Sequence, residues 1–367
     1  MNEAEVKIHD VAFGGSGVGK LPDGKVVFVP RTLTGETVRV KLGKSRKGFS
    51  EAELLGIVSP SPHRVPPPCA YFGACGGCQY QHASYDEQVR IKEKQVRDTL
   101  ARIGGFKELP PSHFEGAPSP FGYRNKISIH RGEGSELGFI ATDHRTVVDV
   151  EKCLIANDSV NAKLITLRKS SYRAPHVTLS DSSQREGSPE GSFHQVNSAM
   201  AARLLEWVRG QIGGATSARL LDLYSGSGFF TLGLADLFSG VLGVDYDARA
   251  IHEATVNAQK RGVAPAKFLA ADVGERIDPL LEDTSLAGGV ILIDPPREGL
   301  PPAVTTALSA KGSERLIYIS CNPATLARDL KGLAGTGSGR YSFKALGIFD
   351  MFPQTAHIEA VAVLQRK

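Results

Sequence analysis

Short apolar runs alternate with amphipathic stretches over residues 193–367, and this alternation predicts the fold of that region. Helical stretches separate the first five runs, which is typical of a doubly wound α/β fold with a parallel sheet. The last two runs have no helix between them, so we expect them to pair as an antiparallel hairpin. The predicted strands are 219–223, 240–244, 266–270, 289–293, 316–319, 343–348 and 358–364.

The first part of the chain has a different pattern. Residues 1–58 are rich in glycine and valine, and the pair Asp23-Gly24 between two apolar runs is a hairpin signal. Several short strands with tight turns predict a small β-barrel. A proline-rich stretch follows and works as a stiff connector. Residues 59–192 then combine a cysteine-rich start, a helix over 86–103 and short strand-like pieces, so we expect domains at 1–58, 59–192 and 193–367.

Charge and hydropathy limit the possible surroundings of the protein. The net charge of +4 over 367 residues is too small to indicate a nucleic-acid partner by itself. The segment 39–49 has five basic residues and no acid, which fits a solvated face or, more specifically, a contact with phosphates. The N-terminus has no apolar signal core, and no apolar stretch is long enough to span a bilayer. We therefore expect a cytoplasmic monomer with no membrane partner.

Five cysteines, an odd number, argue against a disulfide framework in a reducing compartment. Cys69, Cys75 and Cys78 lie close together, and Cys153 follows far downstream. Four thiolates can hold either zinc or an iron–sulfur cluster, and their spacing alone does not choose between the two.

Cys321 stands between a predicted strand and a predicted helix. Pro323 suits the first position of that helix and Asn322 its cap. Unpaired backbone N–H groups at a helix start favour a thiolate, which is a nucleophile. A buried structural cysteine is an equally good interpretation of this local pattern.

A glycine turn, LDLYSGSG at 221–228, follows the first strand of the α/β region. Asp245 ends the next strand, where an acid holds ribose hydroxyls, and Asp272 follows the third strand, where it could meet an adenine. The alternative is a tight turn with surface acids. Because the third glycine of the dinucleotide fingerprint is missing, S-adenosylmethionine suits this loop better than NAD.

Three further residues converge at the same predicted edge of the sheet. Asp294 and Cys321 follow the fourth and fifth strands, and open α/β sheets bind ligands beyond these strand ends. If the last strand is antiparallel, Glu359 at its start lies there too. A nucleophile, a base and a methyl donor are what methylation of a pyrimidine at C5 requires, because a thiolate must add to C6 before C5 can attack the methyl group. The target base must leave its stack to reach such a pocket.

The chain resembles the RNA 5-methyluridine methyltransferases that use S-adenosylmethionine. The matching stretches are FHQVN at 193–197, LDLYSGSG at 221–228, DPPR at 294–297, SCNP at 320–323 and FP…HIE at 352–359. The resemblance implies a seven-stranded Rossmann-like catalytic domain in which Cys321 is the nucleophile and Glu359 the base. It also implies a group of residues around the donor and the target, namely Gln195, Tyr224, Asp245, Asp272 and Asp294.

Members of this family with the same Cys-x5-Cys-Gly-Gly-Cys pattern hold a [4Fe–4S] cluster, which implies a cluster on Cys69, Cys75, Cys78 and Cys153 in a small α+β iron–sulfur central domain. The N-terminal unit resembles a TRAM domain, an OB-like RNA-binding barrel. The stretch YRNK at 123–126 looks like an RNA contact of the family, and a solvated turn is an equal alternative.

The TRAM unit and the cluster together favour 23S rRNA as the substrate. One alternative is an enzyme of other specificity, acting on tRNA or on cytosine. A different class of alternative is a non-catalytic RNA-binding protein.

Overall fold

The computed structural model describes residues 3–171, 174–181, 195–213, 218–263, 266–282, 289–335 and 339–367. Two units form, each from segments that are not contiguous in sequence. The first unit comprises Met1–Gln95, Ala117–Ser183 and Phe352–His357, and the second comprises Val96–Gly116, Gln184–Met351 and Ile358–Lys367.

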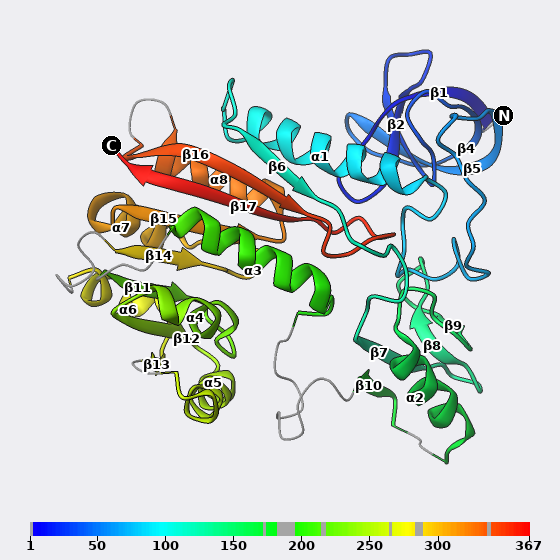
Figure 1. The fold of residues 1–367 in the computed structure, drawn as a ribbon. Coiled ribbons are helices and arrows are strands. Elements are labelled where there is room, and N and C mark those ends of the chain that lie inside the picture. The colour runs from blue at the N-terminus through cyan, green and yellow to red at the C-terminus, as the bar shows by residue number, and fades with distance from the viewer. Residues whose placement is uncertain are drawn as a thin grey trace. The chain divides into compact units, whose positions relative to one another are not determined.

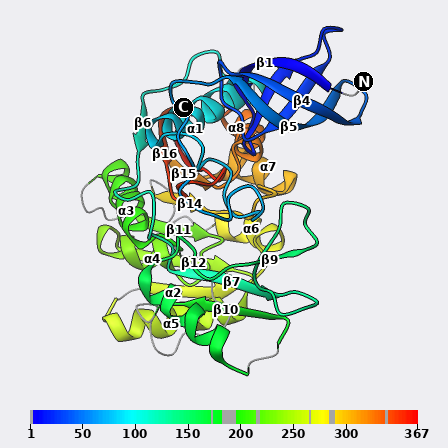
Figure 2. The same cartoon turned by 90° about the vertical axis from the view of Figure 1, so that its right-hand side faces the viewer.

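The N-terminal strands of the first unit close into a barrel, coloured blue in Figures 1 and 2. Valine and isoleucine side chains at alternate positions of the strands fill its interior. The predicted hairpin at Asp23-Gly24 joins β2 to β3, and Gly24 has φ +82°, a conformation that glycine adopts without strain. In the order β1-β2-β3-β5-β4, the strands are β1 (Glu3–Val11), β2 (Ser16–Lys20), β3 (Val26–Pro30), β5 (Phe49–Ser59) and β4 (Thr37–Ser45).

A four-stranded sheet and a helix form another part of the first unit. Helix α2 (Asp158–Lys169) begins at Asn157, whose side chain accepts the Val160 N–H at 2.9 Å. It packs Val160 and Leu164 against Ile127 and Ile129 of the sheet. The strands, in the order β10-β7-β8-β9, are β10 (His176–Ser180), β7 (Lys126–Arg131), β8 (Leu137–Ile140) and β9 (Val147–Asp149). Helix α1 (Tyr85–Arg102), which the sequence predicts at 86–103, belongs to the first unit as far as Gln95.

The second unit contains a mixed sheet, eight-stranded in the described part of the chain. The first five strands are parallel, and β17 lies between β15 and β16 and is antiparallel to both, which confirms the predicted hairpin. In spatial order the strands are β13 (Ala266–Ala270), β12 (Gly240–Asp245), β11 (Arg219–Leu223), β14 (Val290–Ile293), β15 (Arg315–Ser320), β17 (Glu359–Arg366), β16 (Tyr341–Phe349) and β6 (Ser112–Glu115).

Strand β6 makes the sheet one strand larger than the seven that the sequence predicts. It pairs in parallel with β16 and comes from residues 112–115, well before the α/β region. Its sequence, SHFE, has no apolar run, and half of its residues are exposed. Pairing with β16, rather than the sequence pattern of residues 112–115, therefore determines that β6 forms a strand.

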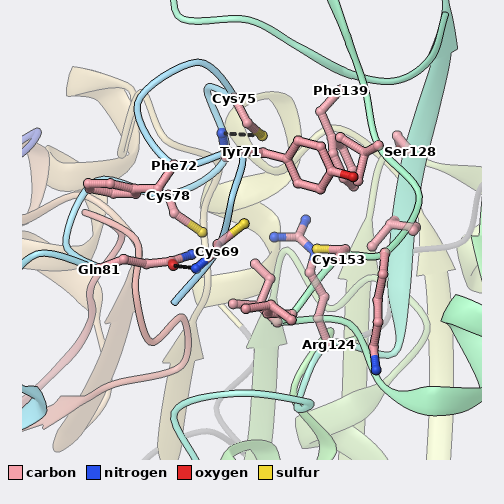
Figure 3. Close-up of a pocket in the computed structure, with 16 residues that line it drawn as sticks. Cys69, Tyr71, Phe72, Cys75, Cys78, Gln81, Arg124, Ser128, Phe139 and Cys153 are labelled. Carbon is pink, nitrogen blue, oxygen red and sulfur yellow. Dashed lines mark hydrogen bonds between the residues drawn. The ribbon is translucent and has the colours of Figure 1, made fainter. Parts of the chain in front are cut away.

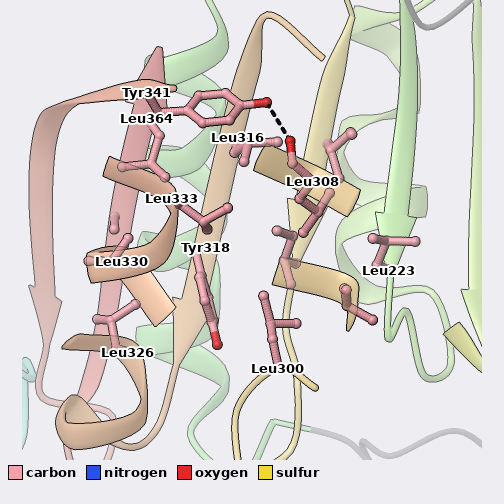
Figure 4. Close-up of a cluster of buried hydrophobic side chains, with 14 of the residues drawn as sticks. Leu223, Leu300, Leu308, Leu316, Tyr318, Leu326, Leu330, Leu333, Tyr341 and Leu364 are labelled. Atoms are coloured by element: carbon pink, nitrogen blue, oxygen red, sulfur yellow. Dashed lines mark hydrogen bonds between the residues drawn. The ribbon is translucent and has the colours of Figure 1, made fainter. Parts of the chain in front are cut away.

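Helices cover both faces of this sheet (Figures 1 and 2). On one face lie α3 (Ser198–Ile212), α4 (Phe229–Leu234), the short helix η1 (Ala235–Leu237) and α5 (Ala248–Arg261). On the other face, α6 (Val273–Leu281), α7 (Pro302–Lys311) and α8 (Pro323–Ala334) bury leucines against the strands (Figure 4). Tyr341 lies at one end of this core and donates its hydroxyl to the Leu308 carbonyl at 3.3 Å. None of the helices in the described ranges combines the length and the apolar character needed to cross a bilayer.

Candidate active site and cysteine pocket

The parallel strands of the second unit end at one edge of the sheet, and most of the predicted site residues stand there. Tyr224 follows β11, Asp245 ends β12, Asp294 follows β14 and Cys321 follows β15. Because β17 runs in the opposite direction, its first residue, Glu359, lies at this same edge.

Cys321 and Glu359 are brought together by strand pairing. The ladder between β15 and β17 ends with Ser320 opposite Ala360, so Cys321 and Glu359 are the next residues on the two strands. Glu359 is 6% exposed, and the Cys321 side chain is partly buried. As predicted, Asn322 caps α8, accepting the Ala324 N–H at 3.1 Å.

The charge around the thiol differs from the sequence-based expectation. Burial first, and then the carboxyls of Glu359 and Asp294, raise the pKa of Cys321 to about 11. Arg297 and the backbone at Cys321 act in the opposite direction and lower the pKa. The backbone therefore acts in the direction expected of a helix start, but burial and the two carboxyls outweigh it in the protein without substrate. The expectation considered the helix start and omitted the two carboxyls that the strand order brings beside the sulfur.

Asp294 connects this pair to the interior of the sheet. Its backbone N–H donates to the Leu223 carbonyl at 3.2 Å, which fixes it beside the end of β11. Burial, together with the neighbouring Asp222 and Asp245, raises the pKa of Asp294 to about 8. Burial and Asp294 likewise raise the pKa of Glu359 well above its ordinary value. Raised pKa values are expected of carboxyl groups that exchange protons near neutral pH.

Asp222 is a site residue to which the sequence analysis gives no role. It is 0% exposed within β11, where Thr231 donates its hydroxyl to the carboxyl. Burial raises its pKa to about 7, and its Oδ1 atom has no hydrogen-bond partner. The sequence feature that could have indicated a role for Asp222 is an acidic residue inside the apolar run LLDL.

The glycine loop after β11 is held by Asp245. The Oδ2 atom of Asp245 accepts the Gly226 N–H at 2.8 Å, and Oδ1 accepts the Asp247 N–H at 2.9 Å. Tyr224 has φ +63°, which is strained for a residue with a side chain. A Cβ atom on Gly228 would come within 3.1 Å of the Phe268 ring, so glycine is needed there for packing.

Two predicted residues occupy the margin of this edge. Asp272 is exposed and caps α6, with its Oδ1 atom accepting the Glu275 N–H at 3.1 Å. Gln195 is partly buried, two residues before the cap of α3. Phe193 and His194 of the motif FHQVN lie outside the described residues.

The four remaining cysteines line one pocket of the first unit (Figure 3). Its cavity has a volume of about 160 Å³, and the surrounding side chains include Phe139 and Arg124. Cys75 accepts the Gly77 N–H at 3.4 Å, and Gln81 accepts the Cys69 N–H at 3.2 Å. The cysteine loop and Cys153 are therefore neighbours, although 75 residues separate Cys78 from Cys153 in the chain. The four lining cysteines are Cys69, Cys75, Cys78 and Cys153.

These thiols are free, and burial raises the pKa of Cys78 to about 12, with the other cysteines adding to the effect. Within the described ranges, no three histidine, cysteine or acidic side chains are grouped so as to hold a single metal ion. Thiol sulfur is nevertheless the donor that iron–sulfur clusters take. A four-iron cluster receives one thiolate on each iron, so its ligands stand farther apart than those of one ion.

The chain matches two described families. A family described as tRNA (Uracil-5-)-methyltransferase matches residues 159–367, more than half of the chain. The TRAM domain matches residues 2–55, which correspond to the five-stranded barrel. Both matches agree with the resemblance found in the sequence motifs.

Individual proteins are similar over the full length. An RNA methyltransferase of Halalkalibacterium halodurans is 31% identical, with 99% of this chain and 97% of the relative covered. The 23S rRNA (uracil(1939)-C(5))-methyltransferase RlmD of Acidithiobacillus ferrooxidans is 32% identical over 99% of this chain and 97% of its own. One similar solved structure is the Pyrococcus abyssi tRNA (uracil-54, C5)-methyltransferase in complex with S-adenosyl-L-homocysteine. It has a TM-score of 0.73 and 23% sequence identity, and the match covers 98% of this chain and 100% of that chain. This last likeness shows a shared fold.

Proposed function

The chain belongs to the tRNA (uracil-5-)-methyltransferase family and is an S-adenosylmethionine-dependent RNA uracil-C5 methyltransferase, and from this premise we propose that Cys321 and Glu359 carry out its chemistry. The observation that carries the proposal is the β15–β17 pairing, which makes these two residues neighbours at the edge where the glycine loop also ends. A thiol and a carboxyl side by side are the two groups that substitution at C5 of uracil needs.

The proposed steps conserve atoms and charge. The Cys321 thiol gives up its proton to solvent, the resulting thiolate forms a bond to C6 of the uracil, and the C5–C6 electron pair moves into the ring, which becomes an enolate. C5 then takes the methyl group from the sulfonium of the donor, whose sulfur keeps the bonding electron pair. The Glu359 carboxylate removes the C5 proton, and the C6–S bond breaks so that Cys321 leaves. The pKa values of Cys321 and Glu359 are both raised in the protein without substrate. A nearby cation favours the ionised form of each group, so binding of the positively charged sulfonium donor would help to ionise them.

The residues around this pair are proposed to hold the methyl donor and the target base. Asp245 and Asp272 would face the ribose and the adenine, and the glycine loop would let the donor approach the backbone. Asp294, which follows β14 between β11 and β15, would lie near the target base. The proposed set is Gln195, Tyr224, Asp245, Asp272 and Asp294.

We propose 23S rRNA as the substrate, and the RlmD relative and the TRAM barrel support this preference. tRNA is the second candidate, since the family description and the Pyrococcus abyssi protein both name it. Methylation of both transcripts in vitro, followed by mass mapping of 5-methyluridine, distinguishes them. Formation of 5-methyluridine in the tRNA transcript alone would overturn the preference for 23S rRNA.

We also propose a [4Fe–4S] cluster on Cys69, Cys75, Cys78 and Cys153, which fits a cavity lined by four free thiols. When bound, such a cluster would supply a covalent link between the cysteine loop and Cys153. In this division of labour, residues 1–58 and 59–192 bind RNA and residues 193–367 catalyse the transfer. Iron and sulfide analysis of anaerobically purified protein tests the cluster, and zinc or no metal would exclude it.

The central experiment separates the addition step from the elimination step. Glu359→Gln should accumulate a covalent protein–RNA adduct on denaturing gels, because Cys321 still adds to C6 but the C5 proton stays. Cys321→Ala should bind RNA, transfer no methyl group and form no adduct, and the double variant should behave in the same way. Turnover near wild type in Cys321→Ala would rule out the nucleophile.

A further inference from the structure

The loop between β14 and α7 carries Asp294 and Arg297, and its second half is fastened to helix α8. The Arg297 carbonyl accepts hydrogen bonds from the Asn322 amide at 3.1 Å and from the Thr325 hydroxyl at 3.2 Å. The guanidinium of Arg328 donates to the Glu298 carbonyl at 2.9 Å. Three side chains from the cap and the first two turns of α8 therefore hold two consecutive carbonyls of the loop.

Asp329 is the buried centre of this attachment. Its Oδ2 atom accepts the Leu300 N–H at 2.8 Å and the Tyr318 hydroxyl at 2.7 Å, and its Oδ1 atom accepts Arg328 Nε at 2.8 Å. The residue is 3% exposed. A buried carboxylate with three donors from a loop, a strand and its own helix connects these elements rigidly.

Gly299 shows how closely the loop lies on the helix. Its φ of +75° favours glycine, and a Cβ atom there would stand 2.6 Å from Asp329 Oδ2 and 2.6 Å from Arg328 Nη2. Contacts that short do not occur, so a side chain at this position would displace either the loop or the Arg328 and Asp329 side chains, and would disturb the attachment in both cases.

The attachment bears on the thiol because α8 begins directly after Cys321. Three charged groups act on the sulfur: Glu359 from β17, and Asp294 and Arg297 from the loop. Asp294 is held separately, through its own N–H bond to Leu223 at the end of β11. Loosening the loop from α8 would therefore move Arg297 and leave the two carboxyls in place.

We propose that Asp329 is a positioning residue for the methyl transfer, fixing the loop to α8 so that the Arg297 guanidinium stays beside Cys321. This inference rests on the proposed role of Cys321 as the nucleophile. Asp329 acts at a distance from the reacting atoms, through Leu300 and Arg328. Its own side chain faces the interior of the domain.

The test compares two variants that each remove a buried hydrogen bond at Asp329. Asp329→Ala removes the bonds to Leu300 and Arg328 and so loosens the second half of the loop, while Asn322 and Thr325 still hold the Arg297 carbonyl. We expect kcat to fall about 10- to 100-fold, since misplacement of a catalytic environment has effects of that size. Tyr318→Phe removes the strand contact but keeps the Leu300 bond, so kcat should stay close to wild type even if stability falls. In Asp329→Ala, KM for the donor and for RNA should change far less than kcat. Asp278→Asn, which loses an exposed contact with Lys311, is the matched control for an aspartate substitution in the same unit.

A second readout needs no turnover. The rate of iodoacetamide alkylation at Cys321, followed by peptide mass spectrometry against pH, should show a midpoint at higher pH in Asp329→Ala than in wild type. Tyr318→Phe should keep the wild-type midpoint. Gly299→Ala should reproduce the Asp329→Ala profile with Asp329 intact, and Asp329→Asn, which keeps one acceptor oxygen, should fall between.

The outcomes separate this inference from the function on which it rests. Asp329 is only structural if Asp329→Ala and Tyr318→Phe lower kcat equally, in proportion to lost stability. The same conclusion follows if the pH midpoint of alkylation is unchanged in both Asp329→Ala and Gly299→Ala. Retained turnover in Cys321→Ala would instead refute the nucleophile itself. If Asp329→Ala does not fold, the Gly299→Ala profile decides.

Discussion

Individual carboxyl groups at the strand edge have pKa values raised above their ordinary range. Burial is the largest cause for Asp222, Asp294 and Glu359 alike, and Asp294 lies close enough to interact with Glu359 as well as with Asp222. The convergence of Cys321 and Glu359 was predictable from the sequence, because the lack of a helix between the last two strands indicates an antiparallel final strand. The high pKa of the thiol was not predictable, since it depends on Asp294 and Glu359 being folded beside it.

The free energy of unfolding should depend on pH because the Asp222 carboxyl is buried. Its carboxyl has a folded pKa of about 7 against an ordinary value of 3.8, so the native state binds the proton more tightly than the unfolded state does. The native state is therefore favoured most below pH 4, and this contribution is lost as pH rises towards 7. Asp222→Asn stays neutral at every pH. The free energy of unfolding of the variant, minus that of wild type, should rise by on the order of 1–3 kcal/mol between pH 4 and pH 7.

Urea titrations at several pH values measure that difference. Asp278→Asn is a suitable control, because the Asp278 side chain is 64% exposed and its substitution should leave the difference nearly constant over this range. A flat difference for Asp222→Asn would mean that the carboxyl is ionised in the folded protein.

At the scale of elements, apolar runs were sufficient to predict the strands of the sheet but not every segment that completes a unit. The runs at 219–223 and 266–270 coincide with β11 and β13. Strand β6 is short and polar, so it carries no signal of its own. The segment Phe352–His357 leaves the sheet after β16 and packs in the first unit, and only long-range contacts reveal this.

That segment is held by a pair of glutamines. Gln354 has φ +69° and is 3% exposed, and its N–H donates to Gln88 Oε1 at 3.0 Å while Gln88 Nε2 donates to Gln354 Oε1 at 3.0 Å. Gln88→Ala leaves these buried groups without partners, which should lower the free energy of unfolding by about 1–3 kcal/mol. Gln365→Ala, which removes two bonds of a partly exposed side chain, to Glu314 at 3.0 Å and to Arg315 at 3.2 Å, should lower it less than Gln88→Ala does, because water can replace the lost partners. Equal effects in urea titrations would show that the glutamine pair does not stabilise the segment.

At the scale of the whole molecule, sequence patterns indicated a barrel, a cysteine-bearing region and an α/β region, and the fold contains all three. The sequence left open which chemistry the cysteines serve, because spacing does not report how far apart thiols stand after folding. The pocket shows that Cys153 lies beside Cys69, Cys75 and Cys78 in the folded protein. The barrel and the methyltransferase region were recognisable because each carries local motifs.

RNA binding by the whole protein should depend on the basic residues of the barrel. Lys44 near the end of β4 and Lys47 in the connection to β5 are exposed, whereas Arg46 in that connection pairs with Glu51 at 3.7 Å. If each lysine contacts one phosphate, the double substitution Lys44→Ala/Lys47→Ala should reduce the slope of log affinity against log salt by about 1.4 for single-stranded RNA. Affinity should fall for every RNA alike, because phosphate contacts read no sequence, and kcat at saturating RNA should not change.

Fluorescence anisotropy with a labelled RNA at several salt concentrations measures this slope. Lys311→Ala is the matched control, since that lysine already pairs with Asp278 and Glu282 in the second unit and should leave the slope unchanged. An unaltered slope in the double variant would place the phosphate contacts elsewhere. A fall in kcat at saturating RNA would instead mean that the barrel orients the target base, because purely electrostatic tethering affects association and not the chemical step.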